Sequence, residues 1–384
     1  MKEQSGHKIL FINQATGYLM KDVINEFCAE YDDVVLLAGH VSDIGGSLNQ
    51  KVAIRLIHKY NKKNRSNRFF SWIWGTIQAI LLISLQYRKY HLVITSNPPT
   101  LAFLPLFCRN KYSVIIYDVY PDGLVAGGFI SETSCVNRLW IKQNIRYYNK
   151  ASNIYTLTES MADTLSKYVP REKIKVIVPW SLFSGSSKVK KEENIFIKKY
   201  NLSNFFLVMY SGNIGLGHNV ESLIEVARVL RNVNDIKFVI IGDGWNKALI
   251  EKRISEFGLI NCLLLPFQPS NMFRHSLSAA DIGVVSVTSA ASKVCAPSKT
   301  YNLINLEIPL LCITDHETEL AKIVNSNEIG KVCNNSQYEE MAEFILSFKN
   351  DCSLYQSISD NLKRCSNNYT IENAHKYLIN FRNN

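Results

Sequence analysis

Short apolar runs alternate along the chain with polar loops and amphipathic stretches. The runs of the first half are KILFIN (8–13), VVLLAGH (34–40), HLVITSNPPT (91–100), YSVIIYDVYPD (112–122), SNIYTLTES (152–160) and IKVIVPW (174–180). Those of the second half are FFLVMYSGN (205–213), IKFVIIGDG (236–244), DIGVVSV (281–287) and IPLLCIT (308–314). Nearly continuous apolar strands separated by helices are typical of parallel sheets covered on both faces. The pattern therefore predicts an α/β fold.

The chain of 384 residues has the length of two such domains. Between the two halves lies a Ser-rich and then charged stretch, SLFSGSSKVKKEENIFIKKY (181–200), which has no clean period. We therefore predict a Rossmann-like N-terminal domain over 1–182, a linker over 183–200 and a Rossmann-like C-terminal domain over 201–365. A final helix over 366–384 is expected to pack back towards the N-terminal domain.

The net charge of +10 favours an anionic partner, which could be nucleic acid, an anionic membrane face or a phosphorylated substrate. The nine cysteines form no C-x-x-C pair, so they are expected to be buried thiols in a reducing cytosol. The first apolar run is too short for a signal peptide and is better interpreted as a strand. No G-x-G-x-x-G pattern follows that strand, which argues against a dinucleotide-dependent oxidoreductase.

One stretch, 51–87, has an unusual composition. Residues 51–68 contain seven Lys or Arg and no acid, and residues 69–87 have no formal charge. A membrane-spanning helix, a helix or hairpin lying on a membrane surface, and a packed core helix all remain open. We favour surface docking, because basic groups attract anionic lipid and aromatic rings lie well at the interface. No nucleic-acid module is visible. The candidate membrane residues are Lys59, Lys62, Lys63, Arg65, Arg68, Trp72 and Trp74.

Two motifs of the second half could hold an anion. In YSGNIGLGHNVESLI (210–224), glycines follow a strand and precede a helix, so the backbone could approach a phosphate. In PSKTYNLINLEIP (297–309), Lys299 is expected near a helix start, where a further positive charge is unfavourable unless an anion is bound. Each motif alone could equally be structural: a tight turn in the first case, a solvent-facing lysine in the second.

Taken in order, these motifs resemble the C-terminal domain of GT-B fold glycosyltransferases of the large family 4 group. The segments between them that carry the resemblance are IGDG and LLLPFQPSNMFRHSLSAADIGVVS. In the first half, TSNPPTLAFLPLF, YDVYPDGLVAGGFI and TLTESMADTL before VIVPW are similar too. The resemblance covers nearly the whole chain and is strongest to the bacterial branch that builds capsule, O-antigen and colanic-acid-type polysaccharides.

The resemblance implies a GT-B fold, with two Rossmann-like domains whose parallel sheets face a cleft. It also implies a retaining transferase that binds its nucleotide-diphosphate sugar in the C-terminal domain and its acceptor in the N-terminal domain. No metal and no cofactor other than the donor substrate are expected, and the sequence has no D-x-D motif. The donor-binding candidates are Gly17, Gly212, Asn213, His218, Lys299, Tyr301 and Asn302.

Asp118, after an apolar strand, is the catalytic candidate, since a carboxylate there could orient or deprotonate an acceptor hydroxyl. It could equally cap a turn, and Glu159 is a weaker candidate that is better interpreted as a helix-start acid.

The sequence departs from the family at several donor-binding positions. Asn213 and His218 stand where an Arg and a Lys are usual, and Val294 and Asn302 stand where two glutamates are usual. Leu306-Glu307 replaces the usual small residue and glycine. Either the donor is gripped differently or activity is reduced.

We expect a glycosyltransferase of surface polysaccharide synthesis that is peripherally attached to the cytoplasmic face of the plasma membrane and acts on a lipid-linked saccharide. The alternatives are a non-catalytic GT-B scaffold or binding subunit and a nucleotide-sugar epimerase of the same fold.

Overall fold

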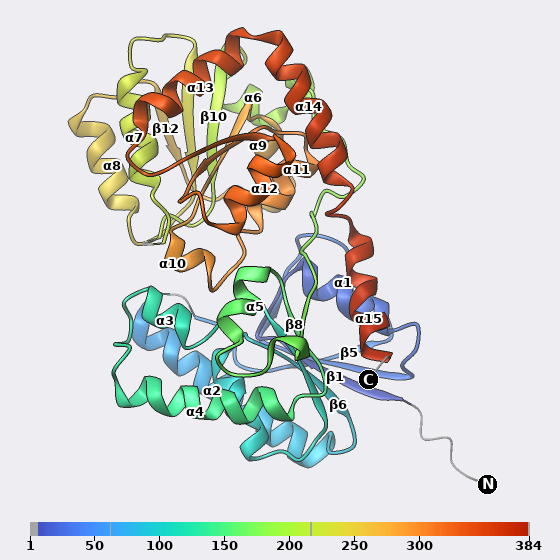
Figure 1. Ribbon diagram of the computed structural model, residues 1–384. Coiled ribbons are helices and arrows are strands. Elements are labelled where there is room, and N and C mark those ends of the chain that lie inside the picture. The colour runs from blue at the N-terminus through green and yellow to red at the C-terminus, as the bar shows by residue number, and fades with distance from the viewer. Residues whose placement is uncertain (1–6, 62, 216, 383–384) are drawn as a thin grey trace. The chain divides into compact units, whose positions relative to one another are not determined.

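The computed structural model describes residues 7–61, 63–215 and 217–382. The chain divides into two compact units, each built around a parallel sheet (Figure 1). Unit 1 comprises Met1–Leu182, Val294–Ala296 and Ile371–Asn384, and unit 2 comprises Phe183–Lys293 and Pro297–Thr370. The predicted α/β class, with a parallel sheet in each of two Rossmann-like units, is confirmed.

The larger sheet of unit 1 has the strand order β5-β3-β1-β6-β7-β8-β9, and every neighbouring pair is parallel. The chain builds outward from β1 on one side and then from β6 on the other, so the strand order reverses between β1 and β6. In open α/β sheets, ligands bind at the carboxyl ends of the strands beside such a reversal. The strands of unit 1, including the short pair β2 and β4, are β1 (Lys8–Ile12), β2 (Ala15–Thr16), β3 (Asp33–Ala38), β4 (His40–Val41), β5 (Val52–Leu56), β6 (His91–Thr95), β7 (Tyr112–Ile116), β8 (Ile154–Thr156) and β9 (Ile174–Val176).

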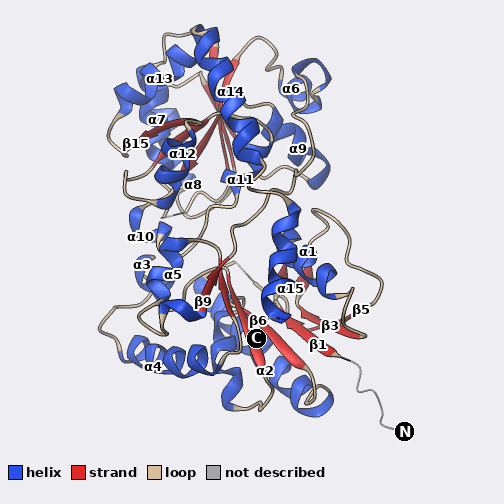
Figure 2. Cartoon of the chain, turned by 45° about the vertical axis from the view of Figure 1, so that its right-hand side comes forward, coloured by secondary structure: helices blue, strands red, loops and turns tan. Residues whose placement is uncertain are grey.

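Both faces of this sheet are covered, because successive side chains of a strand point to opposite sides. In β1, Ile9 and Phe11 enter one apolar core, while Leu10 and Ile12 enter the other. Helices α1 and α15 cover the first face, and α2, α4 and α5 cover the second (Figure 2). The helices of unit 1 are α1 (Tyr18–Phe27), α2 (Arg65–Gln86), η1 (Pro99–Leu106), α3 (Asp122–Ala126), α4 (Cys135–Lys150), α5 (Glu159–Leu165), η2 (Arg171–Lys173), η4 (Ile371–Ala374) and α15 (His375–Arg382).

The sheet of unit 2 has the order β12-β11-β10-β13-β14-β15, again with every neighbouring pair parallel. Its strand order reverses between β10 and β13, so the loops after these two strands flank the expected ligand position. The strands are β10 (Phe206–Ser211), β11 (Ile236–Ile241), β12 (Cys262–Leu265), β13 (Ile282–Ser286), β14 (Leu310–Ile313) and β15 (Gly330–Cys333).

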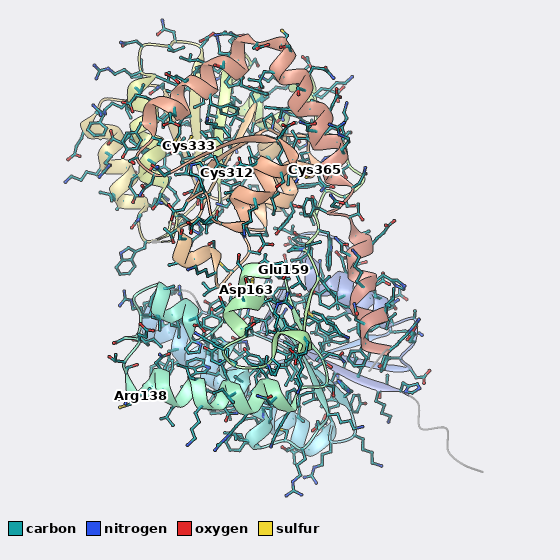
Figure 3. The ribbon with its side chains drawn as sticks, in the orientation of Figure 1. Arg138, Glu159, Asp163, Cys312, Cys333 and Cys365 are labelled. Atoms are coloured by element: carbon teal, nitrogen blue, oxygen red, sulfur yellow. The ribbon has the colours of Figure 1, made fainter. Side chains whose placement is uncertain are left out.

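The helices of unit 2 follow its strands in alternation, as in a doubly wound sheet (Figure 1). Buried cysteines lie within its packed interior: Cys312 and Cys333 come from the neighbouring strands β14 and β15, and Cys365 comes from α14 (Figure 3). The helices are η3 (Lys191–Glu193), α6 (Ile195–Tyr200), α7 (Val220–Val229), α8 (Lys247–Glu256), α9 (Ser270–Ser278), α10 (Ser289–Ser292), α11 (Lys299–Asn305), α12 (Glu319–Asn327), α13 (Tyr338–Asn350) and α14 (Cys352–Ser366).

The segment interpreted as a linker, 183–200, is partly a structural element of unit 2. It contains η3 and α6, and Phe196 and Ile197 of α6 are fully buried. Asn194 starts α6, since its side-chain oxygen accepts from the backbone N–H groups of Phe196 and Ile197. The surrounding lysines concealed this short apolar anchor.

Three described non-glycine residues of unit 2 adopt left-handed backbone conformations: Asn201, Glu307 and Glu328. Glu307 has φ 54° at the position where the resembling family usually has glycine, and Glu328 has φ 50° at the end of α12. A side chain in this region is strained. The carboxylate of Glu307 also attracts the buried Lys188, whereas Glu328 is exposed.

We expect Glu328→Gly to raise the free energy of unfolding of unit 2 by about 0.5–1 kcal/mol, because it removes left-handed strain from an exposed position. Glu307→Gly should gain less, because it also removes the charge that faces Lys188. Scanning calorimetry of the full chain measures both. A Glu307→Gly gain as large as that of Glu328→Gly would contradict this view of Lys188.

Candidate functional site

Unit 2 carries an ammonium group that its own residues do not neutralise. Lys299 is the first residue of α11, and its Nζ is buried with no hydrogen-bond partner among the described residues. The Nζ atom lies 3.9 Å from the centroid of the Tyr210 ring, at the end of β10. The attraction of a cation to a ring face is much weaker than its attraction to an anion. Burial lowers the pKa of Lys299 from 10.5 to about 7.

The glycine-rich loop after β10 is shaped around this ammonium. A Cβ on Gly212 would lie 2.7 Å from the Nζ of Lys299, so a larger residue there would displace the ammonium from its present position. The loop is fixed from below: the Tyr210 hydroxyl donates to the carbonyl of Asn213 at 2.6 Å, and the N–H of Ile214 donates to the carbonyl of Asp243 at 2.9 Å. The loop after β11 therefore holds the loop after β10 in place.

Close approach of these two loops requires a second glycine. A Cβ on Gly242 would lie 2.0 Å from the carbonyl oxygen of Gly212, which no side chain could accommodate. The IGDG turn thus supports the glycine-rich loop.

His218 is brought to the same end of the sheet by β13. Its Nδ1 lies 2.8 Å from the carbonyl oxygen of Ser286, the last residue of β13, and the backbone N–H of Asn219 donates to the Ser286 hydroxyl at 3.0 Å. Because a carbonyl only accepts, Nδ1 carries the proton. Burial and the nearby charge of Lys299 lower the pKa of His218.

This tautomer limits how His218 could bind an anion. With Nδ1–H bonded to Ser286, Nε2 of the neutral ring is an acceptor and donates only when the ring is protonated. An anion bound there would therefore draw a proton onto the ring.

The remaining donor-binding candidates fall into two groups. Asn213 is exposed on the loop, and Asn302 lies three residues after Lys299 on the same face of α11, although it is buried. Tyr301, two residues from Lys299, faces elsewhere: it is 2% exposed and packs on Tyr369 with ring centroids 4.9 Å apart. The expectation that its ring or hydroxyl contacts the donor is not supported by this position.

Asp118 of unit 1 lies beyond the carboxyl end of β7. The backbone N–H groups of Tyr117 and Asp118 both donate to the Ser96 hydroxyl at 3.0 Å. Burial raises the pKa of the Asp118 carboxyl from 3.8 to about 6. A small cavity of about 10 Å³ beside it is lined by Ser96, Asn144 and Trp140 among others. A carboxylate with a pKa near neutrality suits a role in proton transfer or hydroxyl orientation.

Aromatic side chains surround Asp118, and one of them corrects a prediction. Trp72, expected at a membrane surface, is 5% exposed and lies between Tyr60 and Tyr120, with ring centroids 6.1 and 6.0 Å away. The residue belongs to the inward face of α2 and cannot meet lipid. Trp74, two residues further, lies on the outward face and is 53% exposed.

The remaining candidates of unit 1 lie apart from this cluster. Gly17 precedes α1, and an added Cβ there would meet no atom within 4 Å. Crowding within the protein therefore does not explain why this position is a glycine. Glu159 starts α5 and forms an ion pair with Arg171, as expected of a helix-start acid (Figure 3). Of the basic candidates, Lys59, Lys63 and Arg65 are exposed, Arg68 is partly exposed, and Lys62 lies outside the described residues.

Sequence reasoning missed two residues of the unit 2 site, Tyr210 and Ser286. Tyr210 supports both the ammonium and the loop, and Ser286 anchors the His218 segment. Both are the terminal or penultimate residues of strands that flank the reversal of strand order, which is the one sequence signal that could have indicated them.

Two Rossmann-like units in one chain form the GT-B fold. Residues 191–364 match the family model of glycosyl transferases group 1, and this match indicates that the protein is a glycosyltransferase.

The chain is similar to two curated bacterial proteins. It is 21% identical over 334 residues to a Pseudomonas aeruginosa protein named as the glycosyltransferase WbjE. This alignment covers 83% of the present chain and 82% of the relative. It is 27% identical over 188 residues to an Escherichia coli protein named as the colanic acid biosynthesis glycosyl transferase WcaI, covering 48% and 46%. Among solved structures, Anabaena Alr3699/HepE in complex with UDP-glucose has a TM-score of 0.73 at 12% identity, covering 98% of this chain and 99% of that one.

We expect Lys299→Met to stabilise the ligand-free protein by about 2–4 kcal/mol, because a buried, unpaired charge is replaced by an apolar chain of similar length. The sign with pH follows from the lowered pKa. Between about pH 7 and 10.5 the unfolded chain binds more protons at this site than the folded chain, so stability of the native sequence rises with pH in that window.

Thermal unfolding from pH 6 to pH 10 tests this, since the contribution of Lys299 to the slope should vanish in Lys299→Met. The exposed Lys322→Met on α12 is the matched control and should leave stability and slope unchanged. A Lys299→Met variant less stable than the native protein would show that the ammonium has a partner.

Proposed function

We propose that this glycosyltransferase binds a nucleotide-diphosphate sugar in unit 2, with Lys299 and protonated His218 facing the diphosphate. The observation that carries the proposal is the buried Nζ of Lys299, which has no hydrogen-bond partner among the described residues and lies against a glycine-rich loop. A diphosphate supplies the missing negative charge. The UDP-glucose bound in the HepE structure supports the same donor class.

During transfer, negative charge develops on the departing diphosphate. Fixed cations aimed at that charge lower the barrier without requiring a metal ion, because they need no reorganisation as the bond breaks. The Lys299 side chain has a flexible stem and can turn its ammonium from Tyr210 towards the phosphate. We propose retention of anomeric configuration, which follows from the family resemblance alone.

We further propose that the acceptor is a lipid-linked saccharide of surface polysaccharide synthesis, and that the enzyme acts at the cytoplasmic face of the plasma membrane. The colanic acid role in the name of one relative supports the pathway class. The exposed basic side chains Lys59, Lys63 and Arg65 and the exposed Trp74 support attachment to an anionic surface. Helix α2 is long and apolar enough to cross a membrane, yet a third of its most apolar part is buried in unit 1.

A non-catalytic scaffold is the second candidate. It is favoured by Val294 and Asn302, which stand where the resembling family usually has glutamates. A scaffold of this kind binds the nucleotide without turnover, so the two functions separate in a transfer assay.

UDP-, GDP- and dTDP-sugars are tested as a panel. We expect one of these nucleotide classes to raise the unfolding temperature of the native protein. A CMP-sugar, with a single phosphate, should give a smaller shift. Lys299→Met should reduce the shift, because donor binding is weakened, although it is the more stable protein. The absence of any shift in folded native protein would contradict the donor site.

Donor binding should also take up protons, because an anion raises the lowered pKa values of Lys299 and His218. Calorimetric titration at pH 7.5 in two buffers of different ionisation enthalpy measures this uptake. Lys299→Met should reduce the proton uptake, and the double variant that also carries His218→Gln should show none. Uptake that is equal in all three proteins would exclude both residues as diphosphate ligands.

For transfer to the acceptor, we expect Asp118→Asn to lower kcat by about 10²- to 10⁴-fold, the usual contribution of a positioned acid or base. Donor binding should be retained. The native enzyme should lose kcat/KM below about pH 6, where the carboxyl becomes protonated, and the variant should lack this limb. Asp163→Asn on α5, an exposed carboxylate of the same unit (Figure 3), is the control. Full activity of Asp118→Asn would exclude the role.

A further inference from the structure

A groove lies on the outer surface of unit 1, between α2 and η1. Its volume is about 420 Å³, and its walls include Ile73, Ile77 and Ile80 of α2 and Phe103 and Phe107 of the η1 segment. Its two threonines expose little polarity. The Thr100 hydroxyl donates to the carbonyl of Trp72 at 3.1 Å, which leaves its oxygen to accept from the Thr76 hydroxyl at 2.6 Å. The groove is therefore suited to a hydrocarbon ligand.

The groove is part of a continuous apolar stripe on the outward face of α2. Phe70, Trp74, Ile77, Leu81 and Leu85 recur at spacings of three and four residues, and their exposed fractions run from 39% to 74%. The opposite face of α2 is packed into unit 1 through residues such as Gly75, Ala79 and Ile83. An exposed apolar stripe of this length on a helix whose other face is packed is typical of a lipid-contacting surface.

The charge around the groove selects an anionic amphiphile. Residues 44–117 contain no Asp or Glu and eleven Lys or Arg, so this segment carries +11 while the rest of the chain sums to −1. Arg65 and Arg68 start α2, and the guanidinium carbons lie 4.9 and 6.0 Å from the centroid of the Phe129 ring. The Nε of Arg68 is buried and has no hydrogen-bond partner among the described residues.

The spacing of cation and groove fits one molecule. Arg68 precedes Ile73 by five residues, which is about 7–8 Å along a helix, and the groove continues to Leu81 for about 12 Å more. Arg68 and Ile73 are also five steps of about 100° apart and so lie on different sides of α2, which means that a chain attached to a phosphate at Arg68 passes round the helix before it enters the groove. Arg68 also interacts electrostatically with Tyr60 and Tyr120, the rings beside Asp118.

We propose that the α2–η1 groove is a binding site for the isoprenoid chain of the acceptor lipid, with Arg68 facing its phosphate. The bilayer supplies this ligand, but the groove withdraws the first part of the chain from it and thereby fixes where the saccharide head lies. The inference rests on the proposed lipid-linked acceptor, although its test uses no nucleotide and no transfer.

The probe is farnesyl monophosphate below its micelle concentration, with inorganic phosphate and farnesol as partial ligands. Binding to the full chain is followed by tryptophan fluorescence, since Trp74 lies one turn from Ile77. We expect farnesyl phosphate to bind at least about tenfold more tightly than either partial ligand, because only it occupies both parts. Equal binding of farnesol and farnesyl phosphate would overturn the role of Arg68.

Two variants separate the groove from the membrane surface. Ile80→Trp fills the groove with an apolar ring, whereas Leu85→Asn changes the same stripe outside the groove. We expect Ile80→Trp to weaken the binding of farnesyl phosphate by about tenfold or more. The variant should still float with vesicles that contain phosphatidylglycerol. Leu85→Asn should keep the binding of farnesyl phosphate and weaken flotation with the same vesicles. Ile73→Asn, which changes a groove residue outside the stripe, replaces Ile80→Trp if the larger ring prevents folding, as judged by circular dichroism.

Equal effects of Ile80→Trp and Leu85→Asn on farnesyl phosphate binding would overturn the proposal, because the groove would then be only part of the membrane-facing stripe. Failure of the donor-binding experiments leaves this result standing, since no nucleotide is present. Conversely, loss of the groove leaves the donor site of unit 2 untouched.

Discussion

A cation that the fold itself does not neutralise is the constraint on which unit 2 depends. The Lys299 ammonium lies beside the bare backbone of Gly212 and over the Tyr210 ring, and a second glycine, Gly242, lets the supporting loop approach. The Ser286 anchor then brings His218 to the same strand ends. Each of these residues reduces stability or limits sequence choice in the ligand-free protein, and together they form one complementary surface for a diphosphate.

Strand periodicity was the most informative part of the sequence. Runs such as 8–13 and 236–244 were recognised because strands buried on both faces are apolar at nearly every position. Three strands of the two large sheets, β5, β12 and β15, were missed. The strand β5 is an edge strand within the basic stretch and exposes Arg55, so its pattern looked like solvated surface. The helix α6 was hidden in the same way, by lysines around a two-residue apolar anchor.

Side-chain direction on helices limited the site predictions. Lys299 was identified from charge and position, but Tyr301 lies two residues later and therefore on another side of α11. Trp72 and Trp74 are separated by the same step on α2, and one is buried while the other is exposed. Composition groups such neighbours together, whereas the 3.6-residue turn separates them. The two faces of α2 could be assigned only once the packing of the sheet was known, because its apolar residues surround the whole helix.

The composition of unit 1 has a consequence for how the chain is made. Tyr377 and Leu378 of α15 are almost fully buried in the same core as Tyr155 and Trp180, about two hundred residues earlier in the sequence. During synthesis, the whole of unit 2 leaves the ribosome before these side chains become available. Unit 1 therefore waits with the part of this face beside α1 uncovered while the later domain folds, which reverses the usual order in which N-terminal domains are completed first.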